Sequence, residues 1–170
     1  MRHRGPDGSL TWSKGNVILG HTRLAVVDLS VSANQPMLDC SLRYNIIHNG
    51  EIYNYAELRQ ELEKRGAVFQ THSDTEVILE AYKFWGVDCQ EHFNGMWAFA
   101  IYDSEKSELF LSRDRYGVKP VYYANFDGLL AFASEMKPLL VLGVDSEPDW
   151  SEVNRNLQEW SSGLSGNTPF

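Results

Sequence analysis

The strongest indication of the fold is the sequence GMWAFAIYD, residues 95–103. Trp97, Phe99 and Ile101 alternate along it with Ala98, Ala100 and Tyr102. This period of two predicts a β-strand whose two faces are both apolar. The segment SEKS then turns the chain, and ELFLSRD, residues 108–114, returns it. Because neither face of the strand suits water, the sheet is expected to be covered on both sides.

Further strands are predicted on either side of this hairpin. PVYYA, the turn NFDG and LLAFASE continue an antiparallel meander over residues 120–135. Upstream, NVILGHTRLAVVDLS, residues 16–30, predicts a strand, a bend at Gly20 and a second extended piece. LRYNIIHNG predicts a strand over residues 42–50 that stops at Gly50. From residue 141 onward the pattern weakens, and residues 161–170 are expected to be unstructured.

Two helices are predicted between these strands. The first follows Asn54 as the capping residue and ends at Gly66, and the second follows Ser73 and ends at Gly86. AVFQTH, residues 67–72, predicts a brief strand between them. Strands that pair with their sequence neighbours, together with one-sided helices, indicate an α+β fold of stacked antiparallel sheets with helices outside.

Composition narrows the class of protein. A length of 170 residues favours one domain, and a net charge of −8 argues against a nucleic acid or an anionic membrane as partner. There is no apolar run of transmembrane length and no signal segment. Cys40 and Cys89 lack CxxC spacing, and the five histidines are scattered, so we expect a reduced, cytoplasmic protein without a metal site.

Arg23 interrupts an apolar strand in GHTRLAVVD. A guanidinium in such a place must be paired or must face a ligand. Its planar fork suits a carboxylate held by two hydrogen bonds. The alternative is a structural ion pair with an Asp or Glu.

Two other short stretches offer polar groups at the ends of predicted elements. Asn49 and Gly50 could hold an oxygen that gains negative charge when an amide is attacked, or could form an ordinary Asn–Gly turn. Asp74 lies at a predicted helix start, where it could bind a substrate ammonium or simply oppose the helix dipole. Together with Arg23, these groups would suit a zwitterion that carries a side-chain amide, such as glutamine. Asp114 and its neighbours predict a structural polar network.

Seven motifs occur in an order that resembles the glutaminase domain of glutamine-hydrolysing asparagine synthetases, a class II amidotransferase domain with an N-terminal-nucleophile fold. The resemblance covers residues 2–140. The motifs are RHRGPDG, GHTRLAVVDLS, NGEIYN, SDTEV, GMWAFAIYD, RDRYGVKPVYY and ASEMKPLL.

The resemblance implies a fold and a set of site residues. The fold would be an αββα sandwich of two antiparallel sheets flanked by helices. Asn49 and Gly50 would form the oxyanion hole for L-glutamine, and Arg23 would bind its α-carboxylate. Asp74 would anchor the α-ammonium group, and Glu51 would lie against the amino acid. The same pocket would be lined by Leu24, Ala25, Val26 and Val27.

The resemblance also implies parts that this sequence does not contain. The family's nucleophile is an N-terminal cysteine, on a strand followed by a helix, and both elements are expected to be missing before RHRGPDG. Met1 cannot replace a thiolate, and Cys40 and Cys89 have no free α-amino group. We therefore expect residues 1–142 to be an incomplete, inactive amidotransferase domain. Residues 143–170 would be a linker toward an absent synthetase domain, which would bind the cofactors ATP and Mg.

Three interpretations remain open at this stage. The chain could be the glutamine-hydrolysing part of an asparagine synthetase-like enzyme. It could instead be a non-catalytic module that binds amino acids or partners, or part of an amidotransferase that acts on a different carboxylate acceptor. A missing strand would also leave an open sheet edge, through which the chain could self-associate or form a homodimer.

Overall fold

The computed structural model describes residues 3–159, so the expected unstructured segment 161–170 lies outside the described residues. Its contacts divide the chain into two compact units, Met1–Val121 and Tyr122–Phe170. The expected boundary between a domain over residues 1–142 and a linker over residues 143–170 stays a prediction.

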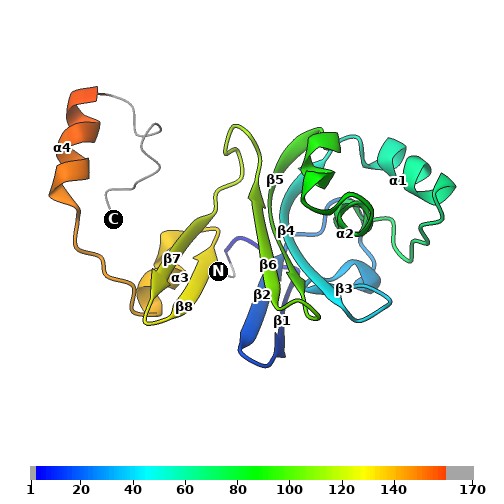
Figure 1. The fold of residues 1–170 in the computed structure, drawn as a ribbon, viewed down its shortest axis with the longest axis horizontal. Helices are drawn as coiled ribbons and strands as arrows, with labels where there is room; N and C mark the ends of the chain where they lie inside the picture. Colours follow the sequence, from blue (N-terminus) through cyan, green and yellow to red (C-terminus); the bar gives the residue numbers. More distant parts are fainter. Residues whose placement is uncertain (1–2, 160–170) are drawn as a thin grey trace. The chain divides into compact units, whose positions relative to one another are not determined.

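The centre of the first unit is a four-stranded antiparallel sheet (Figure 1). Its strands are β3 (Met37–Leu38), β4 (Tyr44–Ile52), β5 (Gly95–Asp103) and β6 (Glu108–Arg113), in that order. β4 and β5 pair over their whole length, from Tyr44 opposite Asp103 to Ile52 opposite Gly95. The quoted stretch 95–103 is thus an inner strand, as its two apolar faces predict.

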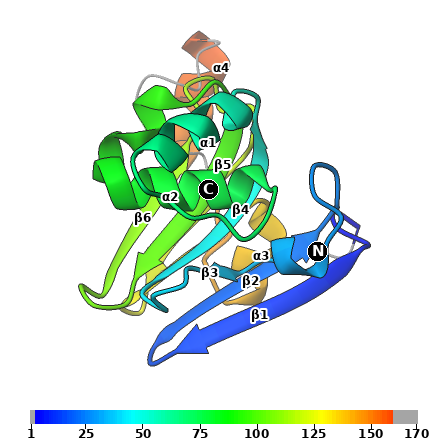
Figure 2. The same ribbon diagram turned by 90° about the vertical axis from the view of Figure 1, so that its right-hand side faces the viewer.

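Helices cover one face of this sheet (Figure 2). They are α1 (Tyr55–Lys64) and α2 (Asp74–Trp85), and α2 continues into the 3₁₀ helix η2 (Gly86–His92). Trp97, Phe99 and Ile101 of β5 pack with buried side chains of both helices in one apolar core. The prediction that the face of β5 formed by Trp97, Phe99 and Ile101 is covered is therefore confirmed.

A hairpin packs against the opposite face. It consists of β1 (Gly8–Lys14) and β2 (Val17–Arg23), which pair in register from Gly8 opposite Arg23. The ring centroids of Trp12 in β1 and Tyr102 in β5 are 6.0 Å apart, and Leu19 in β2 is only 1% exposed. Two antiparallel sheets therefore lie face to face with helices outside one of them, which confirms the predicted α+β class.

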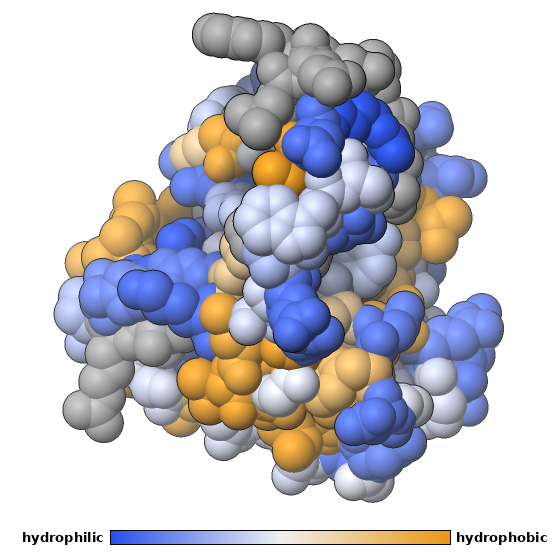
Figure 3. Space-filling view, turned by 90° about the vertical axis from the view of Figure 1, so that its left-hand side faces the viewer, coloured by the Kyte–Doolittle hydropathy of each residue, from blue (hydrophilic) through white to orange (hydrophobic). Residues whose placement is uncertain are grey.

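The second unit contains a hairpin and two helices. β7 (Tyr122–Phe126) and β8 (Leu129–Ala133) are joined by Asp127 and Gly128, which both have positive φ angles, as a tight two-residue hairpin turn requires. α3 (Met136–Val141) follows, and then α4 (Trp150–Glu159). The helix α4 was not predicted from the sequence. Figure 3 looks onto the side of this unit and shows apolar surface there, and Leu129, Leu130 and Val141 are exposed.

Three local predictions in the first unit are wrong. No bend interrupts β2 at Gly20, which pairs directly with Thr11. β4 does not stop at Gly50, because its pairing with β5 continues to Ile52. The side chain of Asn54 does not cap α1. It accepts a hydrogen bond from the backbone N–H of Asn94 instead, and so ties the helix start to the segment before β5.

The strand predicted over residues 67–72 is also absent. The carboxylate of Glu76 accepts hydrogen bonds from the backbone N–H groups of Gln70 and Thr71, at 2.8 and 2.7 Å. A side chain of α2 therefore satisfies the donors that a neighbouring strand would otherwise have satisfied. Ser73 does cap α2 as predicted, because its hydroxyl accepts from the N–H of Glu76.

Candidate functional site

Arg23 lies at the end of β2, where its guanidinium holds the following loop. It donates to the carbonyl oxygen of Ser30 at 2.8 Å, to the amide oxygen of Asn34 at 2.5 Å and to the carbonyl oxygen of Asp28. None of these acceptors is a carboxylate. The structure thus gives Arg23 a set of neutral oxygen acceptors, so its positive charge is not neutralised by them.

The segment Leu24–Val27 that follows is a loop with a bend at Val26 and Val27. Leu24 and Val26 are 61% and 69% exposed, and the backbone N–H of Ala25 donates to the carboxylate of Asp7. Asp7 belongs to the polar segment at the start of the chain and also donates its N–H to the carbonyl oxygen of Arg23. These two bonds fix the start of the loop beside Arg23.

Asn49 and Gly50 lie in the interior of β4, opposite Ala98 and Trp97. The alternative of an Asn–Gly turn is therefore wrong. At position 50 a Cβ atom would stand 2.1 Å from the carbonyl oxygen of Met96, so only glycine fits. Glu51 is the next residue, and like Asn49 it is half-buried.

Asp74 begins α2 and is 6% exposed. Its carboxylate accepts the backbone N–H of Ile52 at 3.0 Å. Burial raises the pKa of this carboxyl group, although the N–H donors around it act in the opposite direction. A buried carboxylate is well suited to a cation, which would supply the compensating positive charge.

Hydrogen bonds join the three candidate groups along one end of β4. Asp28, which accepts from Arg23 through its carbonyl, also accepts the N–H of His72 through its carboxylate at 2.9 Å. His72 is two residues before Asp74, and Asp74 in turn binds Ile52, two residues after Gly50. The Arg23 loop, the start of α2 and the Asn49–Gly50 backbone therefore form one connected region.

The sequence reasoning missed three side chains of this region: Gln35, His48 and Thr75. Gln35 bonds to the other two, with its oxygen 2.5 Å from the N–H of His48 and its nitrogen 3.1 Å from the hydroxyl of Thr75. His48 and Thr75 are both buried. A polar residue within the apolar strand YNIIHNG was the one available signal, since a histidine there needs a partner.

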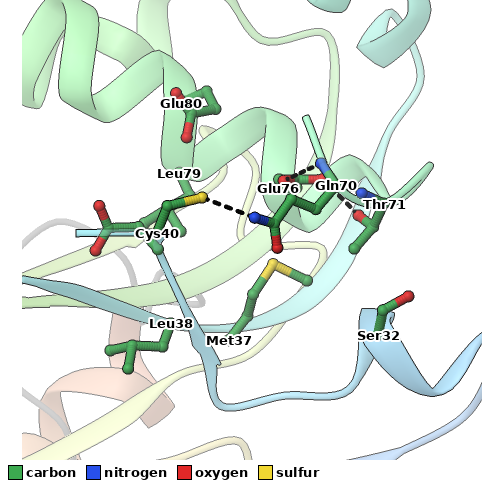
Figure 4. A pocket seen from close by; sticks show the side chains of 10 residues that line it. Ser32, Met37, Leu38, Cys40, Gln70, Thr71, Glu76, Leu79 and Glu80 are labelled. Carbon is green, nitrogen blue, oxygen red and sulfur yellow. Dashed lines mark hydrogen bonds between the residues drawn. The ribbon is translucent and has the colours of Figure 1, made fainter. Parts of the chain in front are cut away.

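A separate small cavity of about 50 Å³ lies between the β3 end and α2 (Figure 4). The side chain of Gln70 donates to the sulfur of Cys40 at 3.0 Å at its rim, and Glu76 and Glu80 of α2 contribute carboxylates. Ligand pockets are several times larger, at roughly 300–1,000 Å³. This cavity is therefore too small for an amino acid.

The two cysteines differ sharply in environment. Cys40 is exposed, whereas Cys89 is fully buried and its pKa is raised to about 12 by burial. Cys89 is thus protonated at neutral pH and cannot act as a nucleophile. No group of three His, Cys, Asp or Glu residues suited to a metal ion occurs between residues 3 and 159.

Asp114 carries the structural polar network predicted around it. Its carboxylate accepts the backbone N–H groups of Val118 and Lys119, and also that of Trp97 in β5. Burial acts to raise its pKa, but these donors outweigh burial and lower it. Asp114 therefore fixes the turn after β6.

Within the described part of the chain, no helix has the length and apolar character that crossing a bilayer requires.

Comparison with known proteins agrees with the fold. The family model of the glutamine amidotransferase domain matches residues 1–167. Asparagine synthetase [glutamine-hydrolyzing] 3 of Bacillus subtilis is 47% identical over 143 residues, which are 82% of this chain and 23% of that protein. A putative asparagine synthetase of Mycobacterium tuberculosis is 43% identical over 175 residues, covering 95% of this chain and 26% of that protein.

Solved structures give the same result. The glutamine phosphoribosylpyrophosphate (PRPP) amidotransferase from Bacillus subtilis, complexed with ADP and GMP, superimposes with a TM-score of 0.66 at 28% identity. The match covers 76% of this chain and 30% of that one. The shared architecture defines the class: an α+β amidotransferase domain of the N-terminal-nucleophile type.

The particular family follows from the sequence matches. The chain belongs to the glutamine amidotransferase domain family, and within it to the glutaminase domains of asparagine synthetase-like proteins. It spans about a quarter of the length of the curated relatives that it matches.

Proposed function

We propose that this chain binds L-glutamine at the end of β4, as the glutamine-hydrolysing part of an asparagine synthetase-like enzyme. Arg23 binds the α-carboxylate and Asp74 binds the α-ammonium group. The side chain of Asn49 and the N–H of Gly50 face the side-chain amide, with Glu51 and the segment Leu24–Val27 around the ligand. The observation that carries this proposal is the bonded connection from Arg23 through Asp28 to His72, beside Asp74.

The charges of the site support an amino acid as ligand. Arg23 is bonded to neutral oxygens only, and the buried Asp74 accepts the N–H of Ile52. A zwitterion brings one carboxylate to the first and one ammonium to the second. Hydrogen bonds to charged groups contribute about 1.5–3 kcal/mol each, so each anchor accounts for roughly 10- to 100-fold in affinity.

Titration calorimetry tests the proposal. The chain should bind L-glutamine, and it should not measurably bind butanamide, which has the amide without the α-groups. Arg23→Ala and Asp74→Asn should each weaken glutamine binding by at least tenfold. Arg65→Ala is the matched control, because Arg65 pairs with Glu61 and lies over Phe84 and Trp85, at the opposite end of α2 from Asp74. Equal binding of glutamine and butanamide would exclude the proposed anchors.

We also propose that these 170 residues by themselves release no ammonia from glutamine. Cys89 is buried and protonated, and Cys40 belongs to the separate cavity beside the middle of α2. Neither thiol is therefore available to attack an amide held by Asn49 and Gly50. Ammonia release that is abolished by Asn49→Ala would overturn this statement. ATP and Mg would belong to a synthetase domain outside these residues, in the cytoplasm.

A different carboxylate acceptor is the second candidate function. Two relatives bear the name amidase, among them Amidase chry2 of Gibberella zeae, which is 37% identical over 94% of this chain. The third interpretation is a non-catalytic amino-acid-binding module. Reading the coding DNA on both sides of this sequence distinguishes the enzyme from the module, because an in-frame cysteine-bearing strand and a synthetase domain support the enzyme, and their absence supports the module.

A further inference from the structure

Gln35 lies two residues before the start of β3, beside β4. The pairs Met37–Ile46 and Leu38–Asn45 define the register of these strands, and extending it by two residues places Gln35 opposite His48. The backbone pairing of β3 with β4 begins only at Met37, so Gln35 lies outside it. The side-chain oxygen of Gln35 instead accepts the backbone N–H of His48 at 2.5 Å.

The other end of the same amide reaches α2. Since the backbone N–H of His48 must face an acceptor, the oxygen of Gln35 is on that side and its NH₂ group faces Thr75. The nitrogen of Gln35 lies 3.1 Å from the hydroxyl of Thr75, and that hydroxyl lies 3.2 Å from Nδ1 of His48. The three residues Gln35, Thr75 and His48 thus form a closed triangle of hydrogen bonds between strand and helix, in which His48 takes part with its backbone N–H and with its ring. His48 and Thr75 are buried.

The triangle lies next to three groups of the proposed glutamine site, Arg23, Gly50 and Asp74. Asn34, the neighbour of Gln35, accepts from Arg23. Thr75 directly follows Asp74. The ring of His48 stands against the backbone of Gly50, since a Cβ atom at position 50 would be 2.8 Å from its Nε2. Nε2 itself has no hydrogen-bond partner among the described residues, so the ring is oriented by Thr75.

We propose that Gln35 and Thr75 are positioning residues, which hold the His48 ring in one tautomer and thereby fix the Asn49–Gly50 backbone relative to Asp74. Thr75 accepts a hydrogen from Gln35 and donates its own to Nδ1 of His48. The ring hydrogen therefore resides on Nε2. This inference rests on the proposed function for its role in glutamine binding, but the hydrogen-bond network can be observed without any ligand.

The direction of the network can be reversed by one substitution. In Gln35→Glu the carboxylate still accepts the N–H of His48, but it has no hydrogen for Thr75. The hydroxyl of Thr75 must then donate to Glu, and Nδ1 of His48 must donate to the hydroxyl. His48 consequently changes from the Nε2–H to the Nδ1–H tautomer. In the unsubstituted chain the ring is neutral, because burial lowers the pKa of His48 to about 3.

Nuclear magnetic resonance of the full chain with ¹⁵N-labelled histidine tests this directly. In the unsubstituted chain Nδ1 of His48 should be the unprotonated nitrogen, and in Gln35→Glu it should be Nε2. Gln90→Glu is the matched control, because Gln90 accepts from Ser112 in a network that does not include His48. The control should leave the tautomer unchanged. An identical protonation pattern in the unsubstituted chain and in Gln35→Glu would overturn the proposal.

A second variant removes the hydroxyl without adding a charge. Thr75→Val should shift the amide resonance of Gly50 and weaken glutamine binding about tenfold, whereas Thr75→Ser should restore both. An unshifted Gly50 amide in Thr75→Val would also overturn the proposal. If the unsubstituted chain binds no glutamine, the proposed function fails, while the tautomer and the Gly50 resonance still decide the network.

Discussion

The carboxylate of Asp74 accepts the backbone N–H of Ile52 at 3.0 Å, so the start of α2 is bonded directly to the end of β4. The contact is buried, and it places an ionisable group where a helix start and a strand end meet. Its consequences for stability and for ligand binding have opposite dependences on pH.

The first prediction concerns the opposite pH dependences of stability and of glutamine binding. Because burial raises the native pKa of Asp74 above its unfolded value of about 4, its contribution to stability is complete below that value and is lost as the pH rises through the native pKa. Glutamine binding needs the ionised form, so affinity should fall as the pH falls through the same pKa. Acidification from neutral pH should therefore raise the free energy of unfolding relative to Asp74→Asn and weaken glutamine binding.

Urea unfolding and calorimetry at a series of pH values measure the two trends. Asp74→Asn should remove the dependence of glutamine affinity on pH, and the difference in the free energy of unfolding between the two chains should grow on acidification from neutrality. The prediction is wrong if affinity is independent of pH in the unsubstituted chain while glutamine still binds.

The elements that the sequence predicted well are those in which local signals and burial agree. The alternation in residues 95–103 identified β5, and Ser73 identified the start of α2. The predictions failed where a side chain replaced a backbone partner. The carboxylate of Glu76 accepts the backbone N–H of Gln70, within the predicted strand 67–72. The side chain of Asn54 accepts the N–H of Asn94 instead of capping its own helix. Such choices depend on residues distant in sequence, which local patterns do not contain.

The candidate site shows the same limit. Arg23, Asn49 and Asp74 were predicted as site residues because they are polar residues at the ends of predicted apolar elements, and Gly50 because it follows Asn49 at such an end. Their connection through Asp28 and His72 could not be read from spacing, because it depends on how the loop after β2 folds back onto α2. Gln35 was missed for a related reason, since its partner lies 13 residues away across an interrupted strand pair.

The second prediction compares the effect of a glycine-to-alanine substitution at two positions, 50 and 20. In Gly50→Ala the new methyl group would meet backbone atoms of both Met96 and Trp97, which cannot move without breaking the β4–β5 pairing. We expect a loss of about 3 kcal/mol of stability, at the upper end for overpacking, together with loss of glutamine binding. Gly20→Ala is the control, because its methyl group would make only ordinary contact with Thr11 at 3.7 Å.

Urea unfolding of both variants provides the measurement. Equal stability of Gly50→Ala and the unsubstituted chain would contradict the close approach of Gly50 in β4 to the carbonyl oxygen of Met96 in β5.

The third prediction concerns thiol reactivity. Cys40 is exposed and should react with a thiol reagent in the native chain. Cys89 is buried, with a pKa raised to about 12, and should react only after unfolding. Mass spectrometry should therefore find one label per chain under native conditions and two in denaturant. Cys40→Ser should abolish native labelling, and native labelling of Cys89 would contradict its burial in the core.

The fourth prediction concerns self-association. The hairpin β7–β8 is a two-stranded sheet, and such hairpins are marginally stable without a covering partner. Leu129, Leu130 and Val141 of the same unit are 45%, 46% and 87% exposed. We expect sedimentation velocity to show a dimer or larger species that grows with concentration. Leu130→Lys should shift the distribution toward the monomer, whereas Val68→Lys, at an exposed site of the first unit, should not. A chain that stays monomeric at every concentration, with or without Leu130→Lys, would show that this apolar surface does not mediate association.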